Sequence, residues 1–130
     1  MTTPVRIQRQ RTRGFDLQAA SRAINGLPVR CVDRSTWWGN PFKIGTTVRI
    51  RDDAGDKIVV AGPIENQAEA VAWFRGMWLA REARSPGLLE RRMRELRGKN
   101  LACWCALGKP CHADVLLELA NRPIKCEATS

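Results

Sequence analysis

The chain has 130 residues, with 22 Lys and Arg against 13 Asp and Glu, and a formal net charge of +9. This length suits one domain with a hydrophobic core and is too short for two. No apolar run reaches the roughly 18 residues of a transmembrane helix, and the first residues lack the apolar stretch of a secretory signal, so we expect no membrane partner. Five cysteines are an odd number for a disulfide framework, which favours a reduced, cytoplasmic setting where cysteines bind metal or react as thiolates.

The pattern of the first third of the chain predicts two short strands and one helix. Residues 5–10 alternate apolar and polar side chains, which predicts a strand with one buried face. Residues 17–25 predict a short helix that is ended by Gly26 and Pro28. An apolar run at residues 29–32 then predicts a second strand.

The middle of the chain predicts a β-hairpin and the longest helix. Residues 47–51 and 57–61 have strand patterns, and the Gly-containing segment 52–56 between them suits a hairpin turn. Residues 66–84 predict a helix, because apolar side chains recur there at helical spacing. We expect this helix to be a scaffold that buries Trp73, Phe74 and Met77.

The last third alternates helix, strand and helix. A helix is expected at residues 87–97, with Ser85 as its N-cap and Pro86 at its first helical position. The remaining elements are a strand and a final helix, at residues 100–103 and 113–121. Together the elements predict an α/β fold of the mixed α+β kind: one compact domain over residues 1–122, in which a small mixed sheet packs against three to four helices. Residues 123–130 are expected to be a flexible C-terminal tail.

Four of the best soft-metal ligands, including the only histidine, lie in one short stretch: Cys103, Cys105, Cys111 and His112. Side chains at positions i and i+2 of a strand share a face, so Cys103 and Cys105 can contribute to one site. Cys111 and His112 fall at the start of the final predicted helix. Two donors from a strand end and two from a helix start suit a closed tetrahedral zinc site. We therefore predict that these four residues are zinc ligands.

Two other interpretations of the cysteines remain open from the sequence. Cys111 can act as a catalytic or redox thiolate, because a helix N-terminus favours negative charge, and Asp114 in the same turn is then a second catalytic residue. The cysteines can also be small core residues, since free cysteine is among the most buried residue types. Cys111 and His112 can bind one ion only if the helix begins at or after them, because successive residues of a helix project about 100° apart.

A second informative segment, residues 33–43, contains two tryptophans, a Gly-Asn-Pro turn and a phenylalanine. It follows a predicted strand, where α/β proteins place ligand-binding loops. We predict a substrate loop in which Trp38 stacks on a base or sugar and Asn40 forms hydrogen bonds. The flanking Arg34 and Lys43 are expected to contact phosphate. The alternative is an aromatic plug that closes one end of the core, with Asn40 serving the turn.

Most of the basic residues are arginines, and they fall into three groups, within residues 6–13, 30–51 and 91–99. The planar guanidinium group binds two phosphate oxygens at once. This composition predicts a nucleotide or nucleic-acid partner that is bound through an arginine-rich surface. The alternative is a solvated basic surface, and we expect Arg91 and Arg92 in particular to lie on a solvated helix face.

Two blocks of sequence are specific enough to indicate a family. One is Trp38-Gly39-Asn40-Pro41-Phe42, and the other, at residues 95–116, includes Leu101-Ala102-Cys103-Trp104-Cys105 and Pro110-Cys111-His112-Ala113-Asp114. The chain resembles, over residues 5–121, an uncharacterised domain family of phages, prophages and bacteria that is known only as a domain of unknown function. It has Asp33-Arg34-Ser35 where the family pattern has Gly-Arg-Pro. The resemblance implies no reaction, but it does imply that the two blocks meet in one site.

Two classes of function are consistent with these features. In the first, a small enzyme of phage or prophage origin acts on a nucleotide, nucleoside or nucleic-acid base between the aromatic loop and the cysteine cluster. In the second, a non-catalytic basic module binds nucleic acid or protein, and the zinc is structural. Three protein ligands plus a water favour the enzyme, because a catalytic zinc keeps an open position, whereas four protein ligands favour the module. From the sequence we favour the enzyme.

Overall fold

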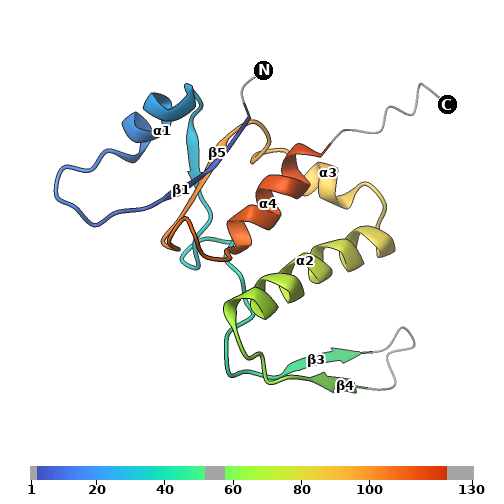
Figure 1. Ribbon diagram of the computed structural model, residues 1–130. Helices are drawn as coiled ribbons and strands as arrows, with labels where there is room; N and C mark the ends of the chain where they lie inside the picture. Colours follow the sequence, from blue (N-terminus) through green and yellow to red (C-terminus); the bar gives the residue numbers. More distant parts are fainter. Residues whose placement is uncertain (1–2, 52–57, 123–130) are drawn as a thin grey trace, which may run out of the picture.

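Three parallel strands form the sheet that organises the fold (Figure 1). The computed structural model describes residues 3–51 and 58–122. The strand order is β1 (Arg6–Gln8), β5 (Asn100–Cys103) and β2 (Val29–Cys31), so a late strand of the chain lies between two early ones. All four residues of β5 are buried. Because the strands are parallel, their carboxyl ends meet at one edge of the sheet.

Helices cover both faces of this sheet. α1 (Leu17–Asn25) connects β1 to β2 and lies on one side, whereas α4 (His112–Asn121) follows β5 and lies on the other (Figure 1). Successive residues of a strand point to opposite faces. Accordingly, Ala102 packs with the α1 side, and Leu101 and Cys103 pack with the α4 side. β5 is therefore the buried centre of the sheet, whereas the flanking strands β1 and β2 are partly exposed.

The long helix α2 (Gln67–Arg84) supplies large side chains to the main core. Its N-cap is Asn66, whose side chain accepts a hydrogen bond from the backbone N–H of Glu69. Phe74 and Trp78 are buried together with residues of α4 and β5. The expected scaffold helix is confirmed, although two of its expected core residues are only partly buried: Trp73 and Met77.

The next helix is shorter than expected. α3 (Leu88–Arg92) has Gly87 as its N-cap, with a φ of 90° that suits glycine, whereas Ser85 caps the end of α2. After α3 the chain continues in tight turns that bury Met93 and Leu96, which are 1% and 0% exposed. Apolar residues three apart fit such turns as well as they fit a helix. For this reason the helix predicted from the sequence is longer than the observed α3.

A separate antiparallel pair of strands, β3 (Val48–Arg51) and β4 (Ile58–Ala61), forms a hairpin beside α2 (Figure 1). A small cluster of Val48, Ile64 and Ala70 attaches it to the start of α2. The α+β class is confirmed, but the strands divide into two sheets and not into one mixed sheet. Two expected segments lie outside the described residues: the hairpin turn at 52–56 and the tail at 123–130.

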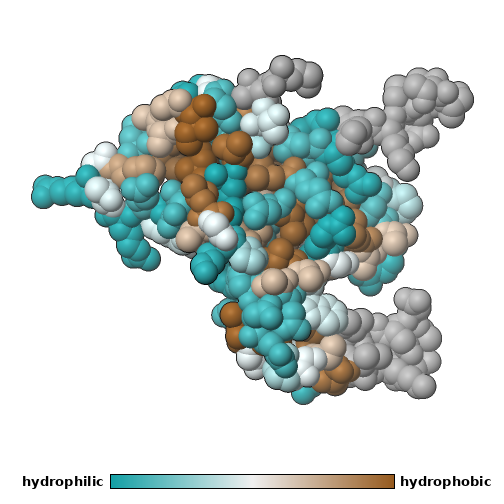
Figure 2. All heavy atoms as spheres, in the orientation of Figure 1, coloured by the Kyte–Doolittle hydropathy of each residue, from teal (hydrophilic) through white to brown (hydrophobic). Residues whose placement is uncertain are grey.

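In the view of Figure 2 the surface is mostly hydrophilic over α4 and mixed over α2, and apolar residues gather beside α1 and the parallel strands. None of the described helices is long and apolar enough to cross a membrane. The described part of the chain exposes several large apolar side chains: Ile24, Trp37, Ile44, Val60, Trp104 and Leu107. The most exposed of them is Trp37, at 66%.

The buried face of α2 gives a direct test of the core. Replacing Phe74 by Ala should lower the free energy of unfolding by about 3–5 kcal/mol, because the removed ring leaves a cavity. A matched control lies two positions further on. No atom lies within 4 Å of where a Cβ on Gly76 would be, so Gly76→Ala should raise stability by up to about 1 kcal/mol. Urea unfolding of both variants checks the prediction, and equal effects would contradict the assigned faces of the helix.

Candidate metal centre

The four predicted metal ligands lie at the carboxyl edge of the parallel sheet. Cys103 is the last residue of β5, and Cys105 follows two positions later. Cys111 is the N-cap of α4 and has extended backbone angles (φ −149°, ψ 142°), and His112 is the first helical residue. The helix therefore begins after Cys111, which meets the condition under which two adjacent residues can face one ion.

The ligand atoms of this cluster are close enough to share a metal ion. Those of Cys103, Cys111 and His112 lie within 4.8 Å of one another. The Sγ atoms of Cys103 and Cys105 are 3.8 Å apart, and Sγ of Cys111 is 3.8 Å from Nδ1 of His112. Zinc–ligand bonds of about 2.0–2.3 Å in a tetrahedron place the ligand atoms about 3.3–3.8 Å apart. The cluster could therefore hold a metal ion with little rearrangement.

A backbone carbonyl from another part of the chain orients the imidazole of His112. Nε2 of His112 is hydrogen-bonded to the carbonyl oxygen of Val32. Because a carbonyl only accepts, Nε2 carries the proton and Nδ1 presents a lone pair towards Cys111. Phe74 packs edge-on against the imidazole, with 5.4 Å between ring centroids. Metal-binding histidines commonly donate their second N–H in this way, which supports His112 as a ligand through Nδ1.

Hydrogen bonds among the thiols concentrate negative charge on one of them. The pKa of Cys103 is lowered to about 5, chiefly because Cys111 donates a hydrogen bond to its thiolate. The same hydrogen bond, together with burial, raises the pKa of Cys111. Burial also raises the pKa of Cys105. These hydrogen bonds favour the charged form of Cys103, at the strand end, over that of Cys111, at the helix N-terminus.

A buried arginine holds the loop between the two pairs of candidate ligands. The side chain of Arg6, on β1, is 7% exposed, and its Nε donates to Oδ1 of Asp114 at 3.1 Å. Its terminal nitrogens donate to four backbone carbonyls of the loop, those of Cys105, Ala106, Leu107 and Lys109. One guanidinium group therefore connects β1, the cysteine loop and the first turn of α4.

These contacts bear on two roles that the sequence suggested. Arg6 was expected in a phosphate-binding group, but its hydrogen-bond donors are used inside the protein. Asp114 was a candidate catalytic residue, and its carboxylate pairs with Arg6 while remaining 53% exposed. The contacts of both residues are those of a structural pair that fixes the cysteine loop.

Two of the four predicted substrate-binding residues are buried. Trp38 is 2% exposed, stacks on Trp78, and donates its Nε1–H to Glu95 at 3.1 Å. Asn40 is also 2% exposed, and its Nδ2 donates to the backbone carbonyl of Ala70 at 3.1 Å. The contacts of Trp38 and Asn40 agree with the alternative in which the loop closes one end of the core.

The other two predicted residues, Arg34 and Lys43, lie at the surface. The guanidinium group of Arg34 donates to the backbone carbonyls of Asn40 and Phe42, so it braces the loop from outside. Glycine is required at position 39, because a Cβ there would lie 2.6 Å from the Cα of Arg34. Lys43 remains exposed and available for a ligand.

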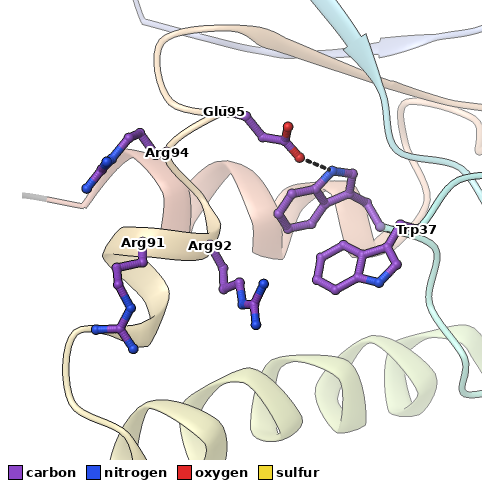
Figure 3. Close-up of a pocket in the computed structure, with 6 residues that line it drawn as sticks. Trp37, Arg91, Arg92, Arg94 and Glu95 are labelled. Carbon is purple, nitrogen blue, oxygen red and sulfur yellow. Dashed lines mark hydrogen bonds between the residues drawn. The ribbon is translucent and has the colours of Figure 1, made fainter.

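The aromatic side chain that the loop exposes is Trp37, which the sequence had not singled out. It is 66% exposed and lines a cleft of about 480 Å³ (Figure 3). The other lining residues are Trp38, Arg91, Arg92, Arg94 and Glu95. Arg91 and Arg92 are exposed on α3, as expected of a solvated helix face, and they also line this cleft. None of the lining residues is a cysteine.

The two sequence blocks meet through the core. Trp38 belongs to the same buried cluster as Cys103 and Cys111. Ring contacts continue from His112 to Phe74, then to Trp78 and Trp38, with successive centroids 5.4, 6.4 and 6.0 Å apart. The candidate metal centre and the aromatic cleft are thus two regions joined by aromatic packing.

The fold and the cluster define the class: an α+β domain with a small parallel sheet and a candidate metal centre at its carboxyl edge. The chain belongs to the family described as Domain of unknown function (DUF4326), whose sequence model matches residues 7–122. That match includes both the aromatic loop and the cysteine cluster. No curated protein and no solved structure matches the chain.

The contacts of Arg6 predict its contribution to metal binding. Arg6→Lys keeps the charge but has no planar fork to reach the loop carbonyls and Asp114 together. Affinity for Co²⁺ or Zn²⁺, measured by competition with a coloured chelator, should fall by about 10- to 100-fold, as for other residues that position ligands. The matched control is Arg11→Lys, on the exposed arginine beside Trp104. Equal affinities of the two variants would rule out the positioning role.

Proposed function

We propose that the protein is a basic nucleic-acid-binding module whose fold is stabilised by one structural zinc ion. The observation that carries the proposal is the burial of the cysteine and histidine cluster. Cys103, Cys111 and His112 form the close group of ligand atoms and are 4%, 0% and 2% exposed. Cys105, which is half-buried and has its Sγ 3.8 Å from that of Cys103, would be the fourth protein ligand. A closed four-ligand set is the usual form of a structural zinc site, whereas catalytic sites keep one position for water or substrate.

The chemistry of the ligands favours zinc among divalent metals. Three thiolates and an imidazole are soft donors in a tetrahedral arrangement, which zinc accepts readily. A zinc ion with three thiolates carries one net negative charge. The guanidinium group of Arg6, which binds the carbonyl of Cys105, offsets that charge nearby.

The charge of the protein supports a nucleic-acid partner. A net charge of +9, contributed mainly by arginine, attracts polyanions and suits phosphate recognition. The competing interpretation, an enzyme that processes a nucleotide at the metal, requires an open coordination position. It also requires an acid or base beside the metal, and the expected one, Asp114, is paired with Arg6.

Metal analysis tests the structural zinc. Purified protein without a histidine tag should contain close to one zinc per chain, and Cys103→Ser or Cys111→Ser should remove the metal and lower the melting temperature, because metal binding is coupled to folding. Cys31→Ser is the matched control: Cys31 lies half-buried at the end of β2, outside the cluster, and its variant should retain zinc. Fully folded protein without metal would contradict the proposal. Absorption of the Co²⁺ form distinguishes four protein ligands from three and a water.

Nucleic-acid binding is tested with a fluorescein-labelled 12-nucleotide oligothymidine. Its affinity, measured by fluorescence anisotropy, should fall linearly on a log–log plot against salt, because bound phosphates release counterions. Polyglutamate of equal charge serves as competitor and should displace the oligonucleotide at least about tenfold less well, since carboxylates offer no base to contact. Absence of binding at low salt, or equal competition by polyglutamate, would refute the nucleic-acid partner.

A further inference from the structure

The cleft beside Trp37 has the size of a binding site and an unusual lining. Its volume of about 480 Å³ lies within the range of small-ligand sites. Figure 3 shows Arg92 nearer to Trp37 than Arg91 and Arg94, whose side chains point away from the tryptophan. Glu95 and Trp38 complete the lining. The cleft therefore offers an aromatic surface at one end and three arginine side chains at the other.

Trp37 is exposed and yet held in a defined position. Its ring is in edge contact with Trp38, at 4.8 Å between centroids and 85° between planes, and with Trp78 at 6.1 Å. The two supporting rings are buried. A large aromatic ring that is 66% exposed but fixed from below is a preorganised surface on which a flat, apolar group can stack.

The three arginines of the cleft are among the described arginines that form no salt bridge. Arg6, Arg9, Arg30 and Arg75 each form a salt bridge with a carboxylate. Among the residues that the structure describes, the three cleft arginines form none, and all three are exposed: Arg91, Arg92 and Arg94. Three like charges within four positions repel one another, and a bound polyanion would relieve that repulsion.

The single carboxylate of the lining is already engaged. Oε1 of Glu95 accepts the Nε1–H of Trp38 at 3.1 Å, and its Oε2 lies 3.6 Å from Nη1 of Arg30. Glu95 thereby supports the tryptophan that lies beneath Trp37. Arg30 partly offsets the negative charge of Glu95. Glu95 therefore repels an anionic ligand less strongly than an unpaired carboxylate would.

We propose that this cleft binds single-stranded nucleic acid, with one base stacked on Trp37 and the adjoining phosphates on Arg91, Arg92 and Arg94. This inference rests on the proposed nucleic-acid-binding function and gives it a site and a substrate class. A duplex does not fit the arrangement, because its base faces are covered by neighbouring base pairs. Three separate guanidinium groups exceed what a single phosphate needs, whereas consecutive phosphates of a strand can each take one.

The test compares two exposed tryptophans. Trp37→Ala should weaken binding of the labelled 12-nucleotide oligothymidine by about 10- to 100-fold, the scale of one lost base–aromatic stack. Binding of a 12-base-pair duplex should change by less than about threefold, because stacking plays no part in it. Trp104→Ala is the matched control, since Trp104 is 38% exposed and lies outside the cleft, and it should leave oligonucleotide affinity near that of the wild type. Retained zinc and circular dichroism establish that each variant is folded.

A second comparison tests the arginines. The double variant Arg91→Ala with Arg92→Ala should reduce the salt slope for oligothymidine by about 1.4, since each single-strand phosphate contact contributes about 0.7. The control, Arg22→Ala with Arg49→Ala, removes the same charge from exposed positions on α1 and β3 and should leave the slope unchanged.

The outcomes separate this inference from the function on which it rests. If the wild type binds no nucleic acid at low salt, the proposed function fails. If the wild type binds but Trp37→Ala and the Arg91 and Arg92 variant bind equally well, only the cleft is wrong. An equal loss on single strands and duplex, or a loss for thymidine monophosphate as large as that for the oligonucleotide, would overturn the single-strand assignment.

Discussion

The fold depends on one buried cation, the guanidinium group of Arg6, and on the five acceptors that surround it. A buried charge is unfavourable unless its hydrogen bonds are satisfied. Here the acceptors are Asp114 and carbonyls of residues 105–109, which belong to a loop and have no ladder of a sheet to pair with. The loop carbonyls thus accept the hydrogen bonds of the arginine, and the arginine supplies donors to carbonyls that have no other strand to pair with. As a result, a residue on the first strand positions Cys105, which lies 99 positions later, and helps to shape the metal centre before any ion binds.

Aromatic packing connects the metal centre to the surface on which we place the ligand. The imidazole of His112 contacts Phe74, which contacts Trp78, and Trp78 supports both tryptophans of the loop. His112 also holds the carbonyl of Val32, just before that loop begins. Close-packed interiors transmit small displacements, since side chains have little free volume to absorb them. A metal that fixes His112 would therefore also fix the platform at Trp37, although the two lie in separate regions.

The sequence predicted what depends on local pattern and on residue chemistry. Periodicity located the strands and helices, and the metal-binding chemistry of cysteine and histidine identified the cluster, because neither inference needs a distant partner. What it could not predict depends on contacts between distant residues. Nothing local distinguishes the buried Trp38 from the exposed Trp37, since the choice follows from the hydrogen bond to Glu95 and the stack on Trp78. Likewise, nothing near Arg6 in the sequence distinguishes it from the other basic residues, because its role depends on a loop about 100 positions later.

The positive charge of the protein is therefore not uniform in its role. Arginines such as Arg6 and Arg9 are bound to carboxylates within the described fold, and they contribute to folding more than to attraction of a ligand. Those of α3 and the turn after it have no such partners among the described residues, and they adjoin the exposed Trp37. Attraction that is merely diffuse would not require an aromatic ring beside the unpaired charges. The coincidence of the two features at one cleft favours a defined ligand site over a basic surface that serves only solubility.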